Sequence, residues 1–237
     1  MVYNFFKNYF SYKLRKIKSV KTSYSQTGLD LILEKIFNDK KNGFYIDVGC
    51  NHPVYNNNTY KFYRRGWRGI NIDTDFESIK LFNYFRNRDI NINTAISSKD
   101  TTLKYYFFHD KSPINTLDES TASLHSKKPS EIRNIDTTTL NKVLKNSNYS
   151  NKKIDFLCID VEGHELEVVK GLDLNIYRPK VIIIEFLDKS IKKIEIKNLN
   201  IKNVLTSDLY NYMLNKNYSL VNWLHSDLVF IDNNFRD

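Results

Sequence analysis

The chain has 237 residues and a formal net charge of +9, with 41% hydrophobic and 14% aromatic residues. A chain of this length can bury the hydrophobic core of one large domain or of two small ones. The apolar content excludes a disordered chain. We expect no transmembrane helix because no run of 18 apolar residues occurs, and no signal peptide because an apolar h-region with a small-residue cleavage site is lacking.

The first 24 residues form a basic, aromatic arm. Residues 1–29 contain six Lys or Arg and no acid, which leaves only +3 for the remainder of the chain. Such a weakly charged body argues against a nucleic-acid partner. Phe5, Phe6, Phe10 and Leu14 are interleaved with the charges, a pattern that fits peripheral contact with an anionic membrane or docking on a partner helix. The simpler interpretation, which we favour from the sequence, is a helix packed on the domain with a solvated basic face.

Residues 25–237 are predicted to form alternating strands and helices. Apolar positions three or four residues apart indicate helices, and short apolar or alternating runs indicate strands. Helices are expected at 29–37, 58–65, 76–85, 136–144, 165–172 and 207–215. Strands are expected at 44–49, 69–73, 90–96, 103–108, 154–160, 181–186, 218–223 and 227–232.

This alternation predicts a single α/β domain. Near-continuous apolar strands are typical of a parallel sheet that helices cover on both faces. Residues 109–135 are polar, contain two prolines and lack a clear period, so we expect a functional loop or lid over an acceptor. Cys50 and Cys158 both lie in apolar runs, which predicts reduced, buried thiols in a cytoplasmic protein.

Five acidic residues follow or end the predicted strands. In open α/β sheets, ligands bind beyond the carboxyl ends of the strands. The acids at those ends are Asp47, Asp73, Asp160, Glu162 and Glu185. A buried carboxylate is costly unless it is paired or liganded, so this many acids at one rim predict a binding or catalytic site.

The segment FYIDVGCNHP, residues 44–53, has too few glycines for a dinucleotide loop. If a G-x-G-x-x-G loop began at Gly49, its second and third glycines would stand at positions 51 and 54. This chain has Asn51 and Val54 there. A ligand with a ribose and a cationic centre but no phosphate fits better, and S-adenosylmethionine is such a ligand. Asp73 lies 26 residues after Asp47, close to the offset of an acid that binds ribose hydroxyls. A dehydrogenase is therefore disfavoured.

Several segments together resemble the FkbM-type S-adenosylmethionine-dependent methyltransferases. They are FYIDVGCNHPVYNNNTYKFYRRGWRGINID, NTAIS, DTTTL and IDFLCIDVEGHELEVVKGL with RPKVIIIEF, between about Ser25 and Phe186, and IDVEGHELEVVKGL is the most distinctive. The resemblance implies a single Rossmann-like class I methyltransferase domain, with a mostly parallel central sheet and helices on both faces. It also implies O-methylation of sugars or other small hydroxylated metabolites.

The resemblance further implies where the cofactor binds. Carried over position by position, the cofactor-binding residues would be Asp47, Gly49 and Asn51 at the methionine end, Asp73 at the ribose, and Asn93 and Ala95 beside the adenine. The family often has glycine where Pro53 stands, so the backbone path beside the cofactor is left open. Asp160 and Glu162 would face the methyl group and the acceptor.

The reaction itself requires activation of the acceptor. A sugar hydroxyl is a poor nucleophile near neutral pH and needs a base or a metal. Asp160, Glu162 and Glu185 can act as a general base or as hard oxygen ligands for Mg²⁺ or Mn²⁺. We expect Asp160 to be the leading base or ligand. His164 is the second candidate for the base if the carboxylates bind metal, and metal dependence is left open.

The function that these observations favour is S-adenosylmethionine-dependent O-methylation of a sugar, nucleotide-linked or derived from a surface glycan. We expect it in the cytoplasm or at the inner membrane surface. RNA, protein or a small metabolite are alternative acceptors. The net charge of only +3 on the chain after residue 29 argues against RNA. A non-catalytic, membrane-associated scaffold is a further alternative, which the retained Asp47, Asp73, Asp160 and Glu162 disfavour. The sequence leaves the oligomeric state open.

Overall fold

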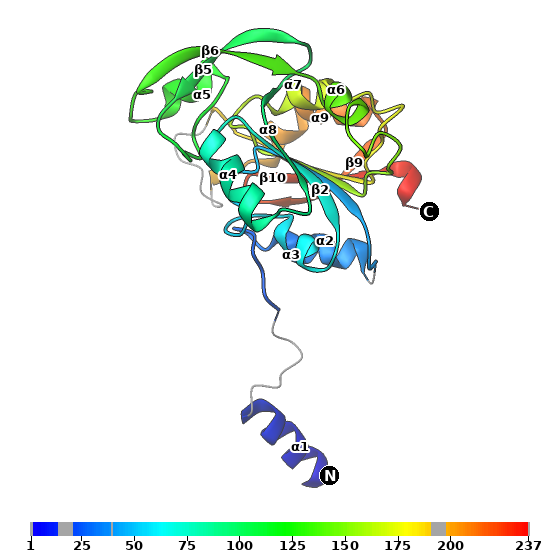
Figure 1. The fold of residues 1–237 in the computed structure, drawn as a ribbon. Coiled ribbons are helices and arrows are strands. Elements are labelled where there is room, and N and C mark those ends of the chain that lie inside the picture. Colours follow the sequence, from blue (N-terminus) through cyan, green and yellow to red (C-terminus); the bar gives the residue numbers. More distant parts are fainter. Residues whose placement is uncertain (1, 14–20, 39, 191–197, 237) are drawn as a thin grey trace.

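A seven-stranded sheet forms the centre of the molecule, in the order β3-β2-β1-β7-β8-β10-β9 (Figure 1). The computed structural model describes residues 2–13, 21–38, 40–190 and 198–236. The strands are β1 (Phe44–Val48), β2 (Arg68–Asp73), β3 (Ile90–Asn93), β7 (Phe156–Ile159), β8 (Val181–Glu185), β9 (Tyr218–Leu224) and β10 (Asp227–Asp232). Strands β3, β2, β1, β7 and β8 pair in parallel, while β10 and β9 are antiparallel additions. The predicted mostly parallel sheet is confirmed.

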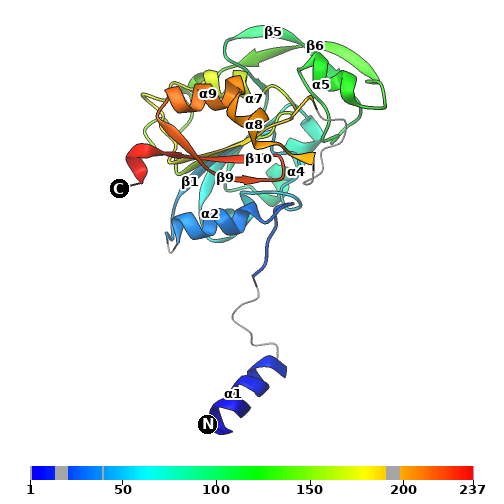
Figure 2. The ribbon, with the colours of Figure 1, turned by 180° about the vertical axis from the view of Figure 1, so that it is seen from behind.

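Helices cover both faces of this sheet, as predicted (Figures 1 and 2). One face packs against α2 (Leu29–Phe37) and α3 (Tyr60–Arg64), and α4 (Phe76–Phe85) follows β2. The other face packs against α6 (Leu140–Lys145), α7 (Glu165–Lys170), α8 (Ile201–Leu205) and α9 (Asp208–Asn215). Successive side chains of a strand point to opposite faces. Both Phe156 and Leu157 of β7 are therefore buried, which explains why the strands are apolar throughout.

A second, three-stranded sheet has the order β4-β6-β5. Its strands are β4 (Ala95–Ile96), β5 (Thr101–Phe107) and β6 (Glu131–Thr138), and α5 (Glu119–Leu124) lies between β5 and β6 in the chain. The strand predicted over 90–96 is in fact divided between the two sheets. The division falls at Thr94, whose backbone N–H donates to the carbonyl oxygen of Asp73 at 3.0 Å.

Two expectations for the middle of the chain are wrong in detail. The helix predicted from residue 136 begins only at Leu140, because β6 continues to Thr138 and pairs with β5. Threonine suits a strand, and Thr139 caps the helix by accepting a hydrogen bond from the Lys142 backbone N–H. Residues 109–135, predicted to lack regular structure, contain α5 and the first part of β6.

The N-terminal helix α1 (Val2–Lys13) stands apart from the α/β body, on the side of α2 and α3 (Figures 1 and 2). Its apolar side chains are exposed, for example Val2 at 70%, Phe5 at 67% and Phe10 at 55%. The sequence-based interpretation of a helix packed on the domain is therefore wrong. None of the helices in the described ranges has both the length and the apolar character needed to cross a membrane.

Candidate active site

A cavity lies at the carboxyl ends of β1, β2 and β7, where the sequence predicts the site. The empty space there is about 690 Å³, including the mouth that is open to solvent. The strand ends contribute Gly49, Asn51, Asp73, Asp160 and Glu162 to its wall. The segment before α5 closes another side with Ser112, Pro113, Asn115, Thr116 and Leu117. This segment belongs to the predicted acceptor lid.

Gly49 allows the ends of β1 and β7 to approach each other. Its φ of +78° lies in the left-handed region that favours glycine. A Cβ atom at this position would lie 1.6 Å from the carbonyl oxygen of Asp160. The single glycine of this loop is therefore required by backbone packing, independently of any ligand.

Asp47 lies behind the cavity wall and not on it. Its carboxylate accepts hydrogen bonds from the Thr59 hydroxyl at 2.9 Å and from the Asn57 side-chain amide at 3.2 Å. Burial raises the pKa of Asp47 to about 6, against the opposing effect of the nearby Arg86 guanidinium. Asp47 thus holds residues 57–59 in place beneath the loop that follows β1.

Arg86 is the centre of this arrangement, and the sequence analysis did not identify it. The side chain is fully buried and forms an ion pair with Asp89 at 3.2 Å. It donates to the Thr59 hydroxyl at 2.8 Å and to the carbonyl oxygen of Pro53 at 3.1 Å. Its guanidinium also lies 4.8 Å from the centre of the Tyr63 ring. The backbone at Pro53, where the family often has glycine, is therefore held by a buried cation.

Asp73 lines the cavity and organises the loop that follows β1. One carboxylate oxygen accepts from the Asn51 backbone N–H at 2.8 Å and the other from the Asp75 backbone N–H at 2.8 Å. Burial raises the pKa of Asp73 to about 6. Each oxygen keeps a further lone pair for a ligand hydroxyl.

The two residues predicted to flank an adenine do not line the cavity. Asn93 is exposed, and its side-chain amide donates to the carbonyl oxygen of Asp73 at 3.0 Å. Ala95 is buried in β4. The cavity wall is formed instead by Thr94 and Ile96, the alternate residues of the same stretch.

Three carboxylates meet at the ends of β7 and β8. Asp160, Glu162 and Glu185 each have an oxygen atom within 4.8 Å of the others. Asp160 is exposed to the cavity, Glu162 is half-buried, and Glu185 is buried. One oxygen of Glu185, Oε2, has no hydrogen-bond partner among the described residues. The predicted acidic cluster is therefore brought together, and it contains an unsatisfied ligand atom.

Their surroundings disfavour charge on these carboxyl groups. Burial, together with the charges of Asp160 and Glu165, raises the pKa of Glu162 to about 9. Burial and the neighbouring acids also raise the pKa of Glu185 well above its usual range. Asp160 is open to the cavity, but the protein atoms packed around it displace bulk water, and this desolvation raises its pKa. Asp227 of β10 lies opposite Glu185 and has its pKa raised to about 7, by burial first and by Asp160 second. A bound proton or a cation would relieve this repulsion.

The turn after Asp160 is held from two sides. Glu162 has a φ of +58°, and its carbonyl oxygen accepts from the Thr116 hydroxyl at 2.6 Å. Glu165 accepts from the Gly163 backbone N–H at 2.8 Å and from the Val161 backbone N–H at 3.1 Å. The segment before α5 is thus tied directly to the carboxylate cluster.

His164, the second candidate for the base, lies outside the cavity wall. Its Nε2 atom is 3.0 Å from the Ser97 hydroxyl oxygen, and the residue is the N-cap of α7. Burial lowers the pKa of this imidazole. The structure does not bring His164 together with the carboxylates around the cavity.

Sequence reasoning missed several residues of the site. Thr116 belongs to the segment predicted as a lid, but its individual role had no signal. Tyr105 lines the cavity from β5, and its hydroxyl hydrogen-bonds with that of Thr74 at 2.9 Å. Asp227 and Arg86 reach the site through contacts between distant parts of the chain, which no local pattern indicates.

Three solved structures are similar to the chain at low identity. A putative caffeoyl-CoA O-methyltransferase from Staphylococcus aureus has 14% identity and a TM-score of 0.43, with 94% of this chain and 90% of that chain covered. An O-methyltransferase from Bacillus cereus in complex with SAH has 11% identity and a TM-score of 0.45, with coverages of 92% and 84%. A TehB-like methyltransferase from Corynebacterium glutamicum has 9% identity and a TM-score of 0.43, with coverages of 96% and 97%. At these TM-scores the structural similarity carries no argument about the site.

A search of curated protein sequences found no significant match. The sequence model of the methyltransferase FkbM domain, in contrast, matches residues 47–220. The matched region includes the loop after β1, the carboxylate cluster and the segment between them. Since it extends over more than half of the chain, the chain belongs to the FkbM methyltransferase family.

Proposed function

We propose that this S-adenosylmethionine-dependent methyltransferase methylates a hydroxyl group of a sugar, either linked to a nucleotide or derived from a surface glycan. The observation that carries the proposal is a carboxylate cluster, with Asp160 and Glu162 on the cavity wall and the buried Glu185 beside them. A hydroxyl acceptor requires removal of a proton, and this cluster can accept one. The hydroxyl and amide groups of Ser112, Asn115 and Thr116 provide hydrogen-bonding partners for a sugar at the same cavity.

The donor side of the cavity fits S-adenosylmethionine. Asp73 presents a carboxylate that can bind ribose hydroxyls, and Asn51 lies beside it. Thr94 and Ile96 provide a wall for the adenine of the cofactor, in place of the predicted Asn93 and Ala95. When bound, the cofactor supplies a methyl group on a positively charged sulfur. Asp73, the carboxylate on this side of the cavity, lies next to the loop after β1 and not in the carboxylate cluster.

The acceptor side fits a divalent cation. Three carboxylate oxygens within 4.8 Å of one another form a hard ligand set of the kind that Mg²⁺ and Mn²⁺ prefer. The unsatisfied Oε2 atom of buried Glu185 supports such a site. We propose that these residues hold Mg²⁺ or Mn²⁺, which would lower the pKa of an acceptor hydroxyl. Asp160, the member exposed to the cavity, is the residue that would orient the hydroxyl, either as a ligand of the cation or, without a cation, as the base that takes its proton.

The test is a methyl-transfer screen over nucleotide-linked sugars and oligosaccharides, with Mn²⁺, with Mg²⁺ and after exhaustive chelation. We expect transfer to a sugar hydroxyl that is lost on chelation and restored by metal. Full activity after chelation would contradict the proposed metal site. Transfer only to RNA, to protein or to metabolites without a sugar would contradict the proposed sugar acceptor.

We place the reaction in the cytoplasm. Cys50 and Cys158 are buried free thiols, and burial raises the pKa of both well above the usual range, as expected for unreactive cysteines in a reducing compartment. Fractionation of cells that produce the full chain tests this placement. Recovery from an extracytoplasmic fraction would contradict it.

A further inference from the structure

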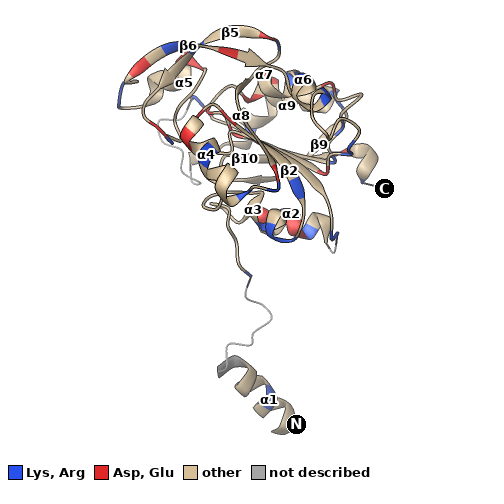
Figure 3. Ribbon diagram, viewed as in Figure 1, with Lys and Arg blue, Asp and Glu red and all other residues tan. Residues whose placement is uncertain are grey.

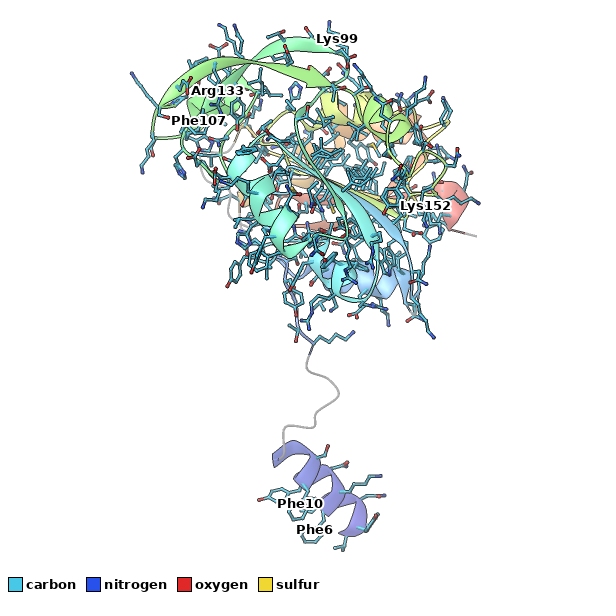
Figure 4. The ribbon with its side chains drawn as sticks, in the orientation of Figure 1. Phe6, Phe10, Lys99, Phe107, Arg133 and Lys152 are labelled. Atoms are coloured by element: carbon cyan, nitrogen blue, oxygen red, sulfur yellow. The ribbon has the colours of Figure 1, made fainter. Side chains whose placement is uncertain are left out.

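Helix α1 has an exposed apolar face. Val2, Phe5, Phe6 and Tyr9 recur at the i, i+3, i+4, i+7 spacing that places side chains on one side of a helix. Asn4, Lys7, Asn8 and Ser11 repeat the same spacing on the opposite side. Phe6 and Phe10 stack on each other with ring centres 6.5 Å apart, and both are at least half exposed (Figure 4). This large aromatic surface is not used by the core of the domain.

The charge of the arm has a single sign. Residues 1–24 contain Lys7, Lys13, Arg15, Lys16, Lys18 and Lys21 and no acidic residue. An amphipathic helix with aromatic residues on one face and Lys7 on the other, in an arm without acidic residues, has the composition of an interfacial membrane helix. A helix that binds an acidic protein can have the same composition, so the choice between the two partners depends on the surface of the body.

A second basic surface lies on the body, on the side from which α1 leaves. Lys21, Lys35, Lys61, Arg64 and Arg65 surround a shallow depression over α2 and α3. The only acid in the lining is Glu34, which pairs with Lys61 at 2.9 Å and with Arg65 at 3.2 Å. Figure 3 shows basic residues on α2 and α3, which lie nearest to α1.

The junction between the two basic regions is well anchored. The backbone N–H of Tyr24 donates to the buried Asp30 carboxylate at 2.8 Å, and its carbonyl oxygen accepts from the Asn57 backbone N–H at 3.0 Å. The Tyr24 ring packs edge-on against Tyr60, with centroids 4.8 Å apart. The arm therefore begins at a fixed point beside the basic surface.

We propose that α1 and the basic surface over α2 and α3 together dock the enzyme on an anionic lipid bilayer. The apolar face of α1 lies in the interface between headgroups and acyl chains, with Lys7 among the anionic headgroups. The depression on the body faces the same headgroups. Aromatic burial and charge attraction act together, as is required for stable peripheral binding.

The experiment is sedimentation of the full chain with vesicles of phosphatidylcholine alone and of phosphatidylcholine mixed with phosphatidylglycerol. We expect binding only to the anionic vesicles, with an affinity that falls as salt is raised. The double substitution Phe6→Ser and Phe10→Ser should weaken binding about tenfold or more, because two aromatic side chains lose their burial. Lys35→Gln should weaken it about fivefold.

Matched substitutions elsewhere on the surface provide the controls. Phe76→Ser with Phe85→Ser removes two exposed aromatics of α4, and Lys152→Gln removes a lysine remote from the arm (Figure 4). Both should bind vesicles like the parent. Equal binding to neutral vesicles, or parental binding by the Phe6 and Phe10 variant, would overturn the proposal. So would self-association or capture of RNA that depends on α1 without vesicle binding. Methyl transfer to a soluble acceptor should be unchanged in all of these variants.

Discussion

The carboxylates on the two sides of the cavity differ in their hydrogen-bond partners. On the β1–β2 side, Asp47 and Asp73 accept hydrogen bonds from amides and a hydroxyl of their own chain. On the β7–β8 side, Asp160, Glu162 and Glu185 face mainly one another, and one oxygen of Glu185 has no partner among the described residues. The first side is complete without a ligand, whereas the second is unsatisfied until it receives a proton or a cation.

This difference separates structural from chemical roles. A carboxylate with fixed donors orders the backbone, and its hydrogen bonds offset part of the energetic cost of burying its charge. A group of carboxylates without donors is unfavourable for folding and therefore points to function. We expect substitutions on the β1–β2 side to affect stability first and substitutions on the β7–β8 side to affect turnover first.

The largest effect should follow from removal of Arg86. Arg86→Met should lower the free energy of unfolding by about 3–5 kcal/mol, because Asp89 and Asp47 lose a buried positive charge. Chemical denaturation measures this change. Arg88→Met is the control, since Arg88 is exposed and stacks 4.5 Å from the centre of the Tyr63 ring. Equal losses in the two variants would show that burial of the charge is not the cause.

Asp160→Asn tests the chemical role expected for the carboxylates on the β7–β8 side of the cavity. The variant should fold and bind S-adenosylmethionine like the parent, while turnover falls at least 100-fold, or about 2.7 kcal/mol in activation free energy. Calorimetry and a methyl-transfer assay separate the two properties. The exposed Asp136 of β6 is the control position, and Asp136→Asn should be silent. An equal loss of cofactor affinity in Asp160→Asn would contradict the division between the two sides.

Asp47 should make stability depend on pH. Its pKa of about 6 in the folded state exceeds the ordinary value of 3.8, so folding favours the protonated side chain. The stability that this preference contributes is fully present below about pH 4 and is lost as the pH rises through 6. Asp47→Asn should therefore stabilise the ligand-free protein by about 2–3 kcal/mol above pH 6 and have little effect below pH 4. Urea unfolding of both proteins across this range tests the sign. A pH-independent difference would mean that lost hydrogen bonds dominate.

The smallest effect concerns the segment over the cavity. Lys127 and Lys128 are exposed between α5 and β6, and we expect trypsin to cleave after Lys127 within the predicted lid. S-adenosylmethionine and acceptor together should slow this cleavage about threefold or more, since residues 112–117 line the cavity. Cleavage near Lys152 and Lys153 should not change. Equal protection at both places would indicate general stabilisation.

The sequence predicted the rim of the sheet well and its connections poorly. Each strand of the central sheet is a short apolar run, and the acids that follow are visible because they interrupt it. The threonines at 137–139 suit either the start of a helix or the end of a strand, and pairing with β5 decides between them. For the stretch from Asn93 to Ile96, the shift to another sheet determines which alternate side chains reach the cavity. Arg86 was missed because, apart from Asp89 three residues later, its partners are distant in the chain, namely Tyr45, Pro53, Thr59 and Asn71.

The absence of one carbon atom at Gly49 has a consequence for how this family can change its substrates. The turn after β1 lies against the Asp160 carbonyl group, so the separation between the donor half and the acceptor half of the cavity is a property of the main chain. Side chains such as Ser112 and Asn115 can be exchanged without altering that separation. We expect relatives to acquire new acceptors by such exchanges, while the spacing between the reacting groups is inherited unchanged.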